Sequence, residues 1–198
     1  RDRADGSQST TITMAVVDAS SDDNFDGVSD QTVTVTTTDN DTAGFTLSST
    51  TATVTEAAGG GNTATYTVVL NAQPDSDVVI SVTSADTGEV TVSSGTLTFT
   101  NGNWDTPQTV TLTGVDDNVI DVDTQTTVTM AVVDNDSDDN FDSVSDQTVT
   151  VTTTDNDTAA FTLGAISGTV TEGGSTATFT VVLGAQPCLL YTSDAADD

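Results

Sequence analysis

The sequence is nearly free of positive charge. It has no lysine and no histidine, and its two arginines, Arg1 and Arg3, stand against 31 acidic residues, 28 of them aspartate. A net charge of -29 argues against nucleic-acid binding, because phosphate contacts need lysine or arginine. An anionic membrane surface would also repel the chain. We therefore expect no nucleic-acid partner and no direct insertion into a membrane.

Cysteine is almost absent as well. The single cysteine, Cys188, lies in an irregular C-terminal stretch, so disulfides do not hold the rest of the chain together. Without histidine or a usable cysteine, zinc and copper lack their usual protein ligands. The usual nucleophile–base pairs also need His, Lys or Cys. We therefore expect the chain not to be an enzyme.

What the sequence has instead is a long internal repeat. Residues 13–47 and 129–163 lie 116 positions apart and are identical at 31 of 35 positions. A repeat of this length is a whole domain, since solenoid repeats span about 20–50 residues. The sequence thus predicts a tandem array of similar domains.

Alignment of the repeats divides the chain into four parts. Residues 1–42 match the last two strands of one unit, 43–157 a complete unit, and 158–187 the first two strands of the next. Residues 188–198 leave the repeat abruptly. We treat this tail as anomalous, non-native sequence and exclude it from the fold prediction.

The complete unit shows the period-two pattern of β-strands. Apolar residues alternate with threonine, and threonine and valine favour pleated, half-buried surfaces. Seven short antiparallel strands predict an all-β, immunoglobulin-like β-sandwich. The residues predicted to face its core are, strand by strand, Ala52 and Val54; Ala64, Tyr66, Val68 and Leu70; Val78, Ile80 and Val82; Leu97 and Phe99; Val110 and Leu112; Val128, Met130 and Val132; Val149 and Val151.

Strand direction predicts where the acids gather. In a seven-stranded antiparallel sandwich the first, third, fifth and seventh strands end at the same pole. The acids that follow these strands are Glu56; Asp86 and Glu89; Asp116, Asp117, Asp121 and Asp123; Asp155 and Asp157. Carboxylates about 4 Å apart repel by about 1 kcal/mol even at the dielectric constant of water. Carboxylate and carbonyl oxygens suit Ca²⁺, so this pole is a predicted calcium site, with a solvated acidic surface as the alternative.

The opposite pole carries Asp75, Asp77, Asp105 and an acidic run at residues 134–146. Residues 134–138, DNDSD, alternate oxygen donors as a calcium loop does, but the glycine and terminal glutamate of an EF-hand are missing. Two interpretations stay open from the sequence, a ligand loop or a hydrophilic turn pinned by Phe141.

These residues resemble a Calx-beta domain, the calcium-binding sandwich named from the sodium–calcium exchanger and common in bacterial surface proteins. The matching motifs are Val54-Thr55-Glu56, the strand Gly95–Phe99, the acids from Asp116 to Asp123 and the closing Asp155-Asn156-Asp157. The resemblance implies a set of calcium ligands. The acidic cluster that follows the fifth predicted strand adds Asp123 as a further candidate. The implied ligands are Glu56, Asp86, Asp116, Asp117, Asp121, Asp155 and Asp157.

We therefore expect a calcium-binding structural repeat that acts as a stiff spacer. The parent would be a large extracellular adhesin or secreted repeat protein, located at the cell surface or outside the cell. Its partners would be neighbouring repeats of the same chain, with host or matrix glycans or proteins contacted through other domains. The alternative is an adhesive module that binds glycan or another ligand through its apical loops or its Thr-rich sheet face.

Overall fold

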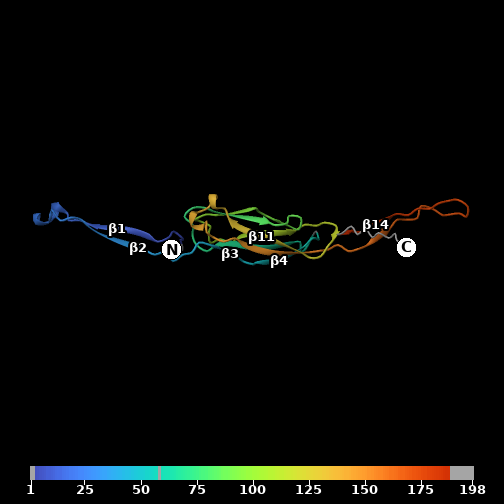
Figure 1. The fold of residues 1–198 in the computed structure, drawn as a ribbon, viewed down its shortest axis with the longest axis horizontal. Helices are drawn as coiled ribbons and strands as arrows, with labels where there is room; N and C mark the ends of the chain where they lie inside the picture. Colours follow the sequence, from blue (N-terminus) through green and yellow to red (C-terminus); the bar gives the residue numbers. More distant parts are fainter. Residues whose placement is uncertain (1–2, 58, 188–198) are drawn as a thin grey trace, which may run out of the picture.

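The molecule is elongated, with a β-sandwich between two projecting hairpins (Figure 1). The computed structural model describes residues 3–57 and 59–187, so Arg1, Cys188 and the anomalous tail lie outside the described residues. The strands are β1 (Gln8–Met14), β2 (Gln31–Thr37), β3 (Phe45–Leu47), β4 (Thr51–Thr55), β5 (Thr63–Leu70), β6 (Val78–Ser84), β7 (Val90–Val92), β8 (Thr96–Phe99), β9 (Gln108–Gly114), β10 (Val119–Ile120), β11 (Thr124–Val132), β12 (Gln147–Thr154), β13 (Phe161–Leu163), β14 (Val181–Leu183) and β15 (Gln186–Pro187). The 3-10 helices are η1 (Asp18–Ser20), η2 (Asp23–Phe25), η3 (Asp134–Asp136) and η4 (Asp139–Phe141). Within the described ranges, no helix has the length and apolar character needed to cross a membrane.

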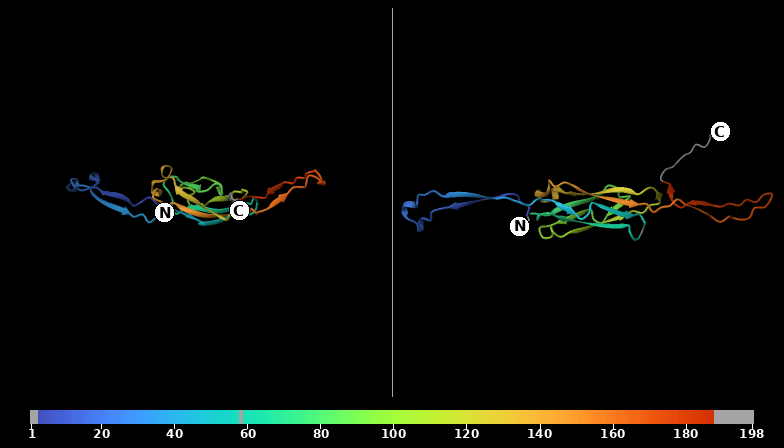
Figure 2. Two further views of the ribbon diagram at one scale, coloured as in Figure 1. Left: turned by 45° about the vertical axis from the view of Figure 1, so that its right-hand side comes forward. Right: turned by 90° about the horizontal axis from the view of Figure 1, so that it is seen from below.

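Two sheets face each other in the central unit (Figure 2). The larger has the strand order β4-β12-β11-β6-β8, and the smaller has the order β3-β5-β9-β7. Neighbouring strands in these two sheets are antiparallel except β4 and β12, which run parallel. The predicted all-β, immunoglobulin-like sandwich is confirmed.

The strands are more numerous than the seven that the sequence pattern predicts. The first predicted strand corresponds to β4, which pairs with β12, and an additional strand that was not predicted, β3, precedes it and pairs with β5 in the other sheet. The sequence analysis also missed β7, which pairs with the end of β9. Three residues are too few to show a clear period of two, although Val90 in β7 is fully buried.

The core lies between the sheets and follows the predicted alternation. Every residue predicted to face it is buried, except that Ala52, Ala64 and Val132 are partly buried and pack against it. Tyr66 and Met130 connect the two sheets, since the Tyr66 hydroxyl donates a hydrogen bond to Met130 Sδ at 3.0 Å. This packing closes one hydrophobic core within the central unit.

The hairpins outside the sandwich expose side chains that are buried in the central unit. β1 pairs with β2 in the same register as β11 with β12, 116 residues later. Met14 is nevertheless 52% exposed, whereas its counterpart Met130 is fully buried. The hairpin of β13 and β14 likewise exposes Phe161 and Leu183. The repeat thus supplies matched pairs of residues, one buried in the central unit and the other exposed in a hairpin.

One such pair tests where the stability of the chain resides. Met130→Ala should lower the free energy of unfolding by about 2–5 kcal/mol, because it opens a cavity between the sheets. Met14→Ala removes the same atoms from an exposed position and should change it by less than about 0.5 kcal/mol. Urea denaturation followed by circular dichroism measures both, and similar losses in the two variants would contradict the single central core.

Candidate metal centre

The ends of four strands meet at one end of the sandwich. β4, β6 and β12 run in the same direction in the larger sheet. The last residue of β9, Gly114, lies so close to the carbonyl of Thr55, at the end of β4, that a side chain there would collide with it. We call this end the acidic pole. Its carboxylates are those of Glu56, Glu89, Asp116, Asp117, Asp121, Asp155 and Asp157.

Glu56, Asp155 and Asp157 form a close triad. One carboxylate oxygen of each lies within 4.8 Å of the others. Glu56 is only 3% exposed, and its backbone N–H donates to the carbonyl of Thr154 at 3.3 Å, which places it beside the end of β12. Asp155 Oδ1 accepts the N–H of Asp157 at 2.7 Å. This turn keeps the two aspartates on the same side of the connection that leaves β12.

Several acids of this pole have a buried oxygen that lacks a hydrogen-bond partner among the described residues. These atoms are Glu56 Oε2, Glu89 Oε2, Asp121 Oδ1 and Asp157 Oδ2. Buried polar atoms are normally paired, and each unpaired one costs about 1–3 kcal/mol, with more for a charged group. The concentration of such atoms at one place indicates a site for a positively charged ligand.

Burial, together with mutual repulsion, raises the pKa values of these acids. Burial, followed by the negative charges of its neighbours, Asp117 first, raises the pKa of Glu56 to about 7. Burial and neighbouring carboxylates also raise the pKa values of Glu89 and Asp157. Protonated Glu56 therefore stabilises the metal-free fold; this contribution is complete below pH 4.5 and is lost as the pH rises through about 7. A cation would remove the repulsion without protons.

Asp116 and Asp117 lie on the segment between β9 and β10. Asp117 Oδ1 accepts the N–H of Val119 at 2.6 Å, and Asp116 Oδ1 accepts from the side chain of Asn156 at 3.2 Å. Both aspartates are exposed, and each keeps a second carboxylate oxygen that could serve a cation.

Two predicted ligands, Asp86 and Asp123, are not part of the triad, although the charge of Asp86 helps to raise the pKa of Glu89. Asp86 is exposed, and its Oδ1 accepts the N–H of Gly88 at 2.9 Å. Asp123 is exposed beside the start of β11. The acid that the structure adds is Glu89, which had been placed at this pole but not among the ligands. The sequence feature that could have revealed Glu89 as a ligand is Val90, because a strand that begins at Val90 places the preceding residue at the acidic pole.

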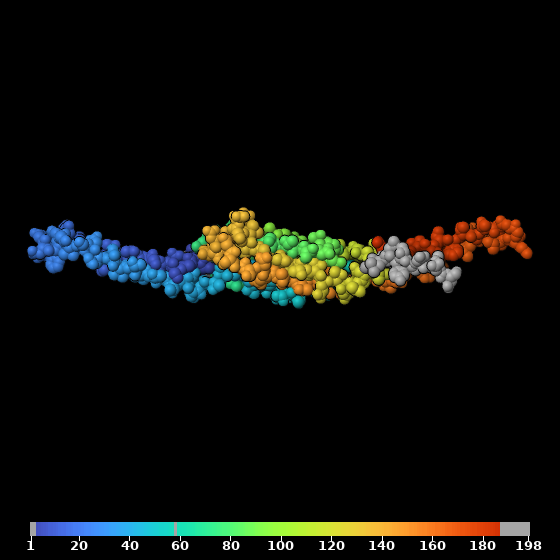
Figure 3. Space-filling view, in the orientation of Figure 1, coloured from blue at the N-terminus to red at the C-terminus, as the bar shows by residue number. Residues whose placement is uncertain are grey.

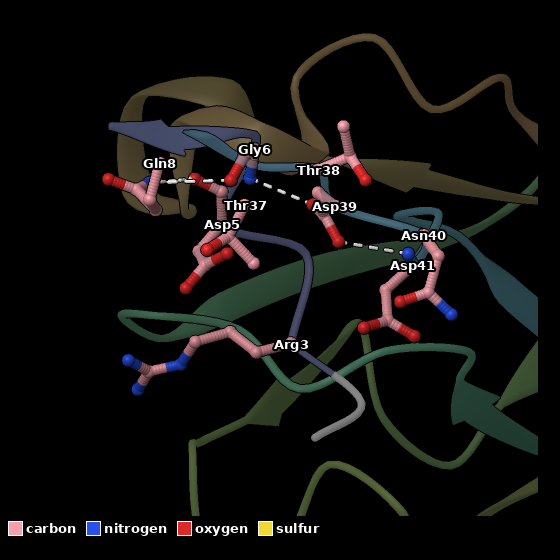
Figure 4. Close-up of a pocket in the computed structure, with 9 residues that line it drawn as sticks. All are labelled: Arg3, Asp5, Gly6, Gln8, Thr37, Thr38, Asp39, Asn40 and Asp41. Atoms are coloured by element: carbon pink, nitrogen blue, oxygen red, sulfur yellow. Dashed lines mark hydrogen bonds between the residues drawn. The ribbon is translucent and has the colours of Figure 1, made fainter. Parts of the chain in front are cut away.

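Part of the acidic pole recurs 116 residues earlier. In the repeat, the counterparts of Asp121, Asp155 and Asp157 are Asp5, Asp39 and Asp41. They line an open pocket beside Arg3 (Figure 4). Asp39 accepts the N–H groups of Asp41 and Gly6 at 2.9 and 2.8 Å, and these bonds lower its pKa. Asp39 is thus satisfied by two backbone amides, one of which has its counterpart in the bond from Asp157 to Asp155.

The acidic run at the opposite pole is organised around Asp138, which is 3% exposed. Its carboxylate accepts the backbone N–H groups of Asp75, Ser76 and Asn140, and also the side-chain amide of Asn140. Burial alone would raise the pKa of Asp138, but these hydrogen bonds outweigh it and lower the pKa. Phe141 is fully buried beneath this loop. The loop is therefore held by amides and an aromatic anchor, as the hydrophilic-turn interpretation predicts.

Comparison with known proteins gives structural similarity alone. No protein-family model matches the chain, and a search of curated proteins finds no relative. Similar solved structures include the apo form of the Calx CBD1 domain, with 17% identity, a TM-score of 0.43 and coverage of 59% of this chain and 100% of that one. They also include domains 4 and 5 of the S-layer protein SbsC (24% identity, TM-score 0.38, coverage 65% and 54%). The periplasmic chaperone SfaE matches at 11% identity and a TM-score of 0.39, and the match spans 57% of this chain and 58% of that one.

The anchoring role of Asp138 can be tested against its own repeat. Asp138→Ala should lower the free energy of unfolding by about 3 kcal/mol, because it leaves buried amides unpaired. The carboxylate of the counterpart, Asp22, is exposed and, among the described residues, accepts hydrogen bonds from Asn24 alone, so Asp22→Ala should change stability by less than about 0.5 kcal/mol. Denaturation with and without calcium measures both; a loss seen only with calcium would make Asp138 a ligand instead.

Proposed function

We propose that the chain is a calcium-binding structural repeat of a cell-surface or secreted protein, with no catalytic role. The observation that carries this proposal is the group of carboxylates with unpaired, buried oxygens at the acidic pole. Among the described residues the positively charged side chain is Arg3, and it pairs with Asp75 at 2.8 Å at the opposite end of the sandwich. An external cation is therefore the available source of compensating charge.

Calcium suits the donor set better than other biological cations. It takes about six to eight oxygen ligands in flexible geometry, whereas Mg²⁺ needs near-ideal octahedral geometry and tends to keep its waters. Glu56, Asp155 and Asp157 would hold the ion, and Glu89 and Asp121 are further acids with unpaired oxygens at the same pole. The ion would supply positive charge to oxygens that lack a hydrogen bond, and its binding would displace the protons that the metal-free cluster retains.

The position of the acidic pole supports a spacer role. Asp155 and Asp157 belong to the connection that leads from β12 directly toward β13, so the candidate ligands lie between the central unit and the following segment. In the space-filling view the hairpins at the two ends of the molecule are narrower than the central sandwich (Figure 3). A cation that joins the connection to Glu56, after β4, would restrict bending there.

Calcium should therefore raise the melting temperature of the full chain. A ligand at about 100 times its dissociation constant adds about 2.7 kcal/mol per site, which shifts the midpoint by several degrees. Glu56→Gln should abolish most of the shift. The matched control is Glu172→Gln, because Glu172 is the exposed counterpart of Glu56 in the next repeat and its loss should leave the shift intact.

Melts in EDTA, in millimolar CaCl₂ and in MgCl₂ at equal ionic strength provide the measurement. Equal shifts with both ions, or no shift, would mean that the acids are general surface charge. An equal loss of the calcium shift in both variants would place the ion elsewhere.

A further inference from the structure

The segment between β9 and β11 reaches beyond its own sandwich. β10, at Val119 and Ile120, pairs in parallel with β15, which belongs to the following partial unit. The N–H of Gln186 donates to the carbonyl of Asn118 at 2.6 Å. This short backbone pairing thus joins the central unit to the segment that follows β14 in the next partial unit.

The same contact occurs at the preceding junction, where Arg3 forms a parallel bridge with Gln73. Arg3 and Val119 are counterparts in the repeat, 116 residues apart. Gln73 and Gln186 are counterparts too, since each is the middle residue of an Ala-Gln-Pro sequence that follows the second strand of its unit. Two junctions in one chain therefore show the same pairing with the same register.

The pairing depends on the backbone more than on side chains. Arginine in one junction stands where valine stands in the other, and both form the bridge. Proline follows glutamine in both units, and it has no N–H to donate to the pairing. At the first junction Ala4 and Ala72 are 5% and 1% exposed, and small side chains allow the two backbones to approach.

The segment that makes this contact also carries part of the acidic pole. Asp117 accepts the N–H of Val119, the residue that faces Gln186. Asp121, with its unpaired oxygen, directly follows Ile120. The candidate ligands and the inter-repeat pairing thus share one stretch of six residues, 116–121.

We propose that residues 116–121 form a connector that docks, by parallel β-pairing, onto the Ala-Gln-Pro segment of the following repeat and sets the angle between successive repeats. The partner is a second unit of the same kind in the same chain. Added-strand pairing of this type gives affinity through main-chain hydrogen bonds, so the contact can recur where the side chains differ. The proposal rests on the spacer role only in treating the units as consecutive repeats, and it does not require calcium.

Disulfide trapping in the full chain tests the connector. Neighbouring strands lie about 4.8 Å apart, within the range of about 4.4–6.8 Å between the Cα atoms of a disulfide. In a Cys188→Ser background, Val119→Cys with Gln186→Cys should close within the monomer on mild oxidation. Arg3→Cys with Gln73→Cys should close in the same way at the other junction, which gives an independent variant if one pair impairs folding.

The register control is Val122→Cys with Gln186→Cys, because Val122 is 79% exposed and lies beyond the pairing. Each paired variant should close at least about ten times faster than this control, since pairing holds the thiols in a reactive geometry. Mass spectrometry and free-thiol counts give the rates, and circular dichroism verifies the fold. Closure no faster than the control at both junctions, or disulfides only between molecules, would overturn the proposal.

The same assay in EDTA and in calcium separates this proposal from the calcium site. Fast closure in EDTA together with a melting temperature that ignores calcium would support the connector and reject the calcium function. Slow closure in both conditions, with a calcium-specific melting shift, would reject the connector and leave the calcium site in place.

Discussion

Repulsion among carboxylates at the end of the sandwich is the constraint on which the rest of the arrangement depends. The strands β4, β6, β9 and β12 all end there, and each is followed by acids. No described lysine or arginine side chain lies among them, so burial and repulsion raise the pKa of Glu56 to about 7. Like charges gathered in this way destabilise the fold, and bound protons or a bound cation would offset that cost. Because the pKa of Glu56 is about 7, a proton on Glu56 meets this need only below that pH, whereas a cation would meet it above.

The two poles meet the cost of buried charge in different ways. At one, Asp138 accepts several N–H groups and its pKa falls. At the other, Glu56 and Asp157 keep buried oxygens without partners, and their pKa values rise. Similar acidity in the sequence therefore produces a hydrogen-bonded turn at one end and a group of carboxylates with unpaired, buried oxygens at the other. The connection that leads toward β13 leaves from the end with the unpaired carboxylates.

Much of this could be predicted from the sequence, since burial follows a period of two along a strand. Alternation identified core residues such as Val68 and Val128, and strand direction placed Glu56 near Asp155. The separate strand β3 escaped prediction, because its three residues are too few to show a clear period of two. Glu89 was overlooked as a ligand for a related reason, since three-residue β7 has too little pattern to reveal where it begins. The backbone N–H groups of Asp75 and Ser76 that bind Asp138 come from a distant segment, so no local sequence motif predicts these hydrogen bonds.

Calorimetric titration of the metal-free chain with Ca²⁺ near pH 6.5 tests the central claim most directly. Two buffers with different ionisation enthalpies report the protons released on binding. Because Glu56 must lose its proton to serve as a ligand, we predict saturable binding with proton release that declines as the pH rises above about 7. The absence of saturable heat, or binding that releases no protons and is matched by Mg²⁺, would contradict a calcium site built from the buried carboxylates of the acidic pole.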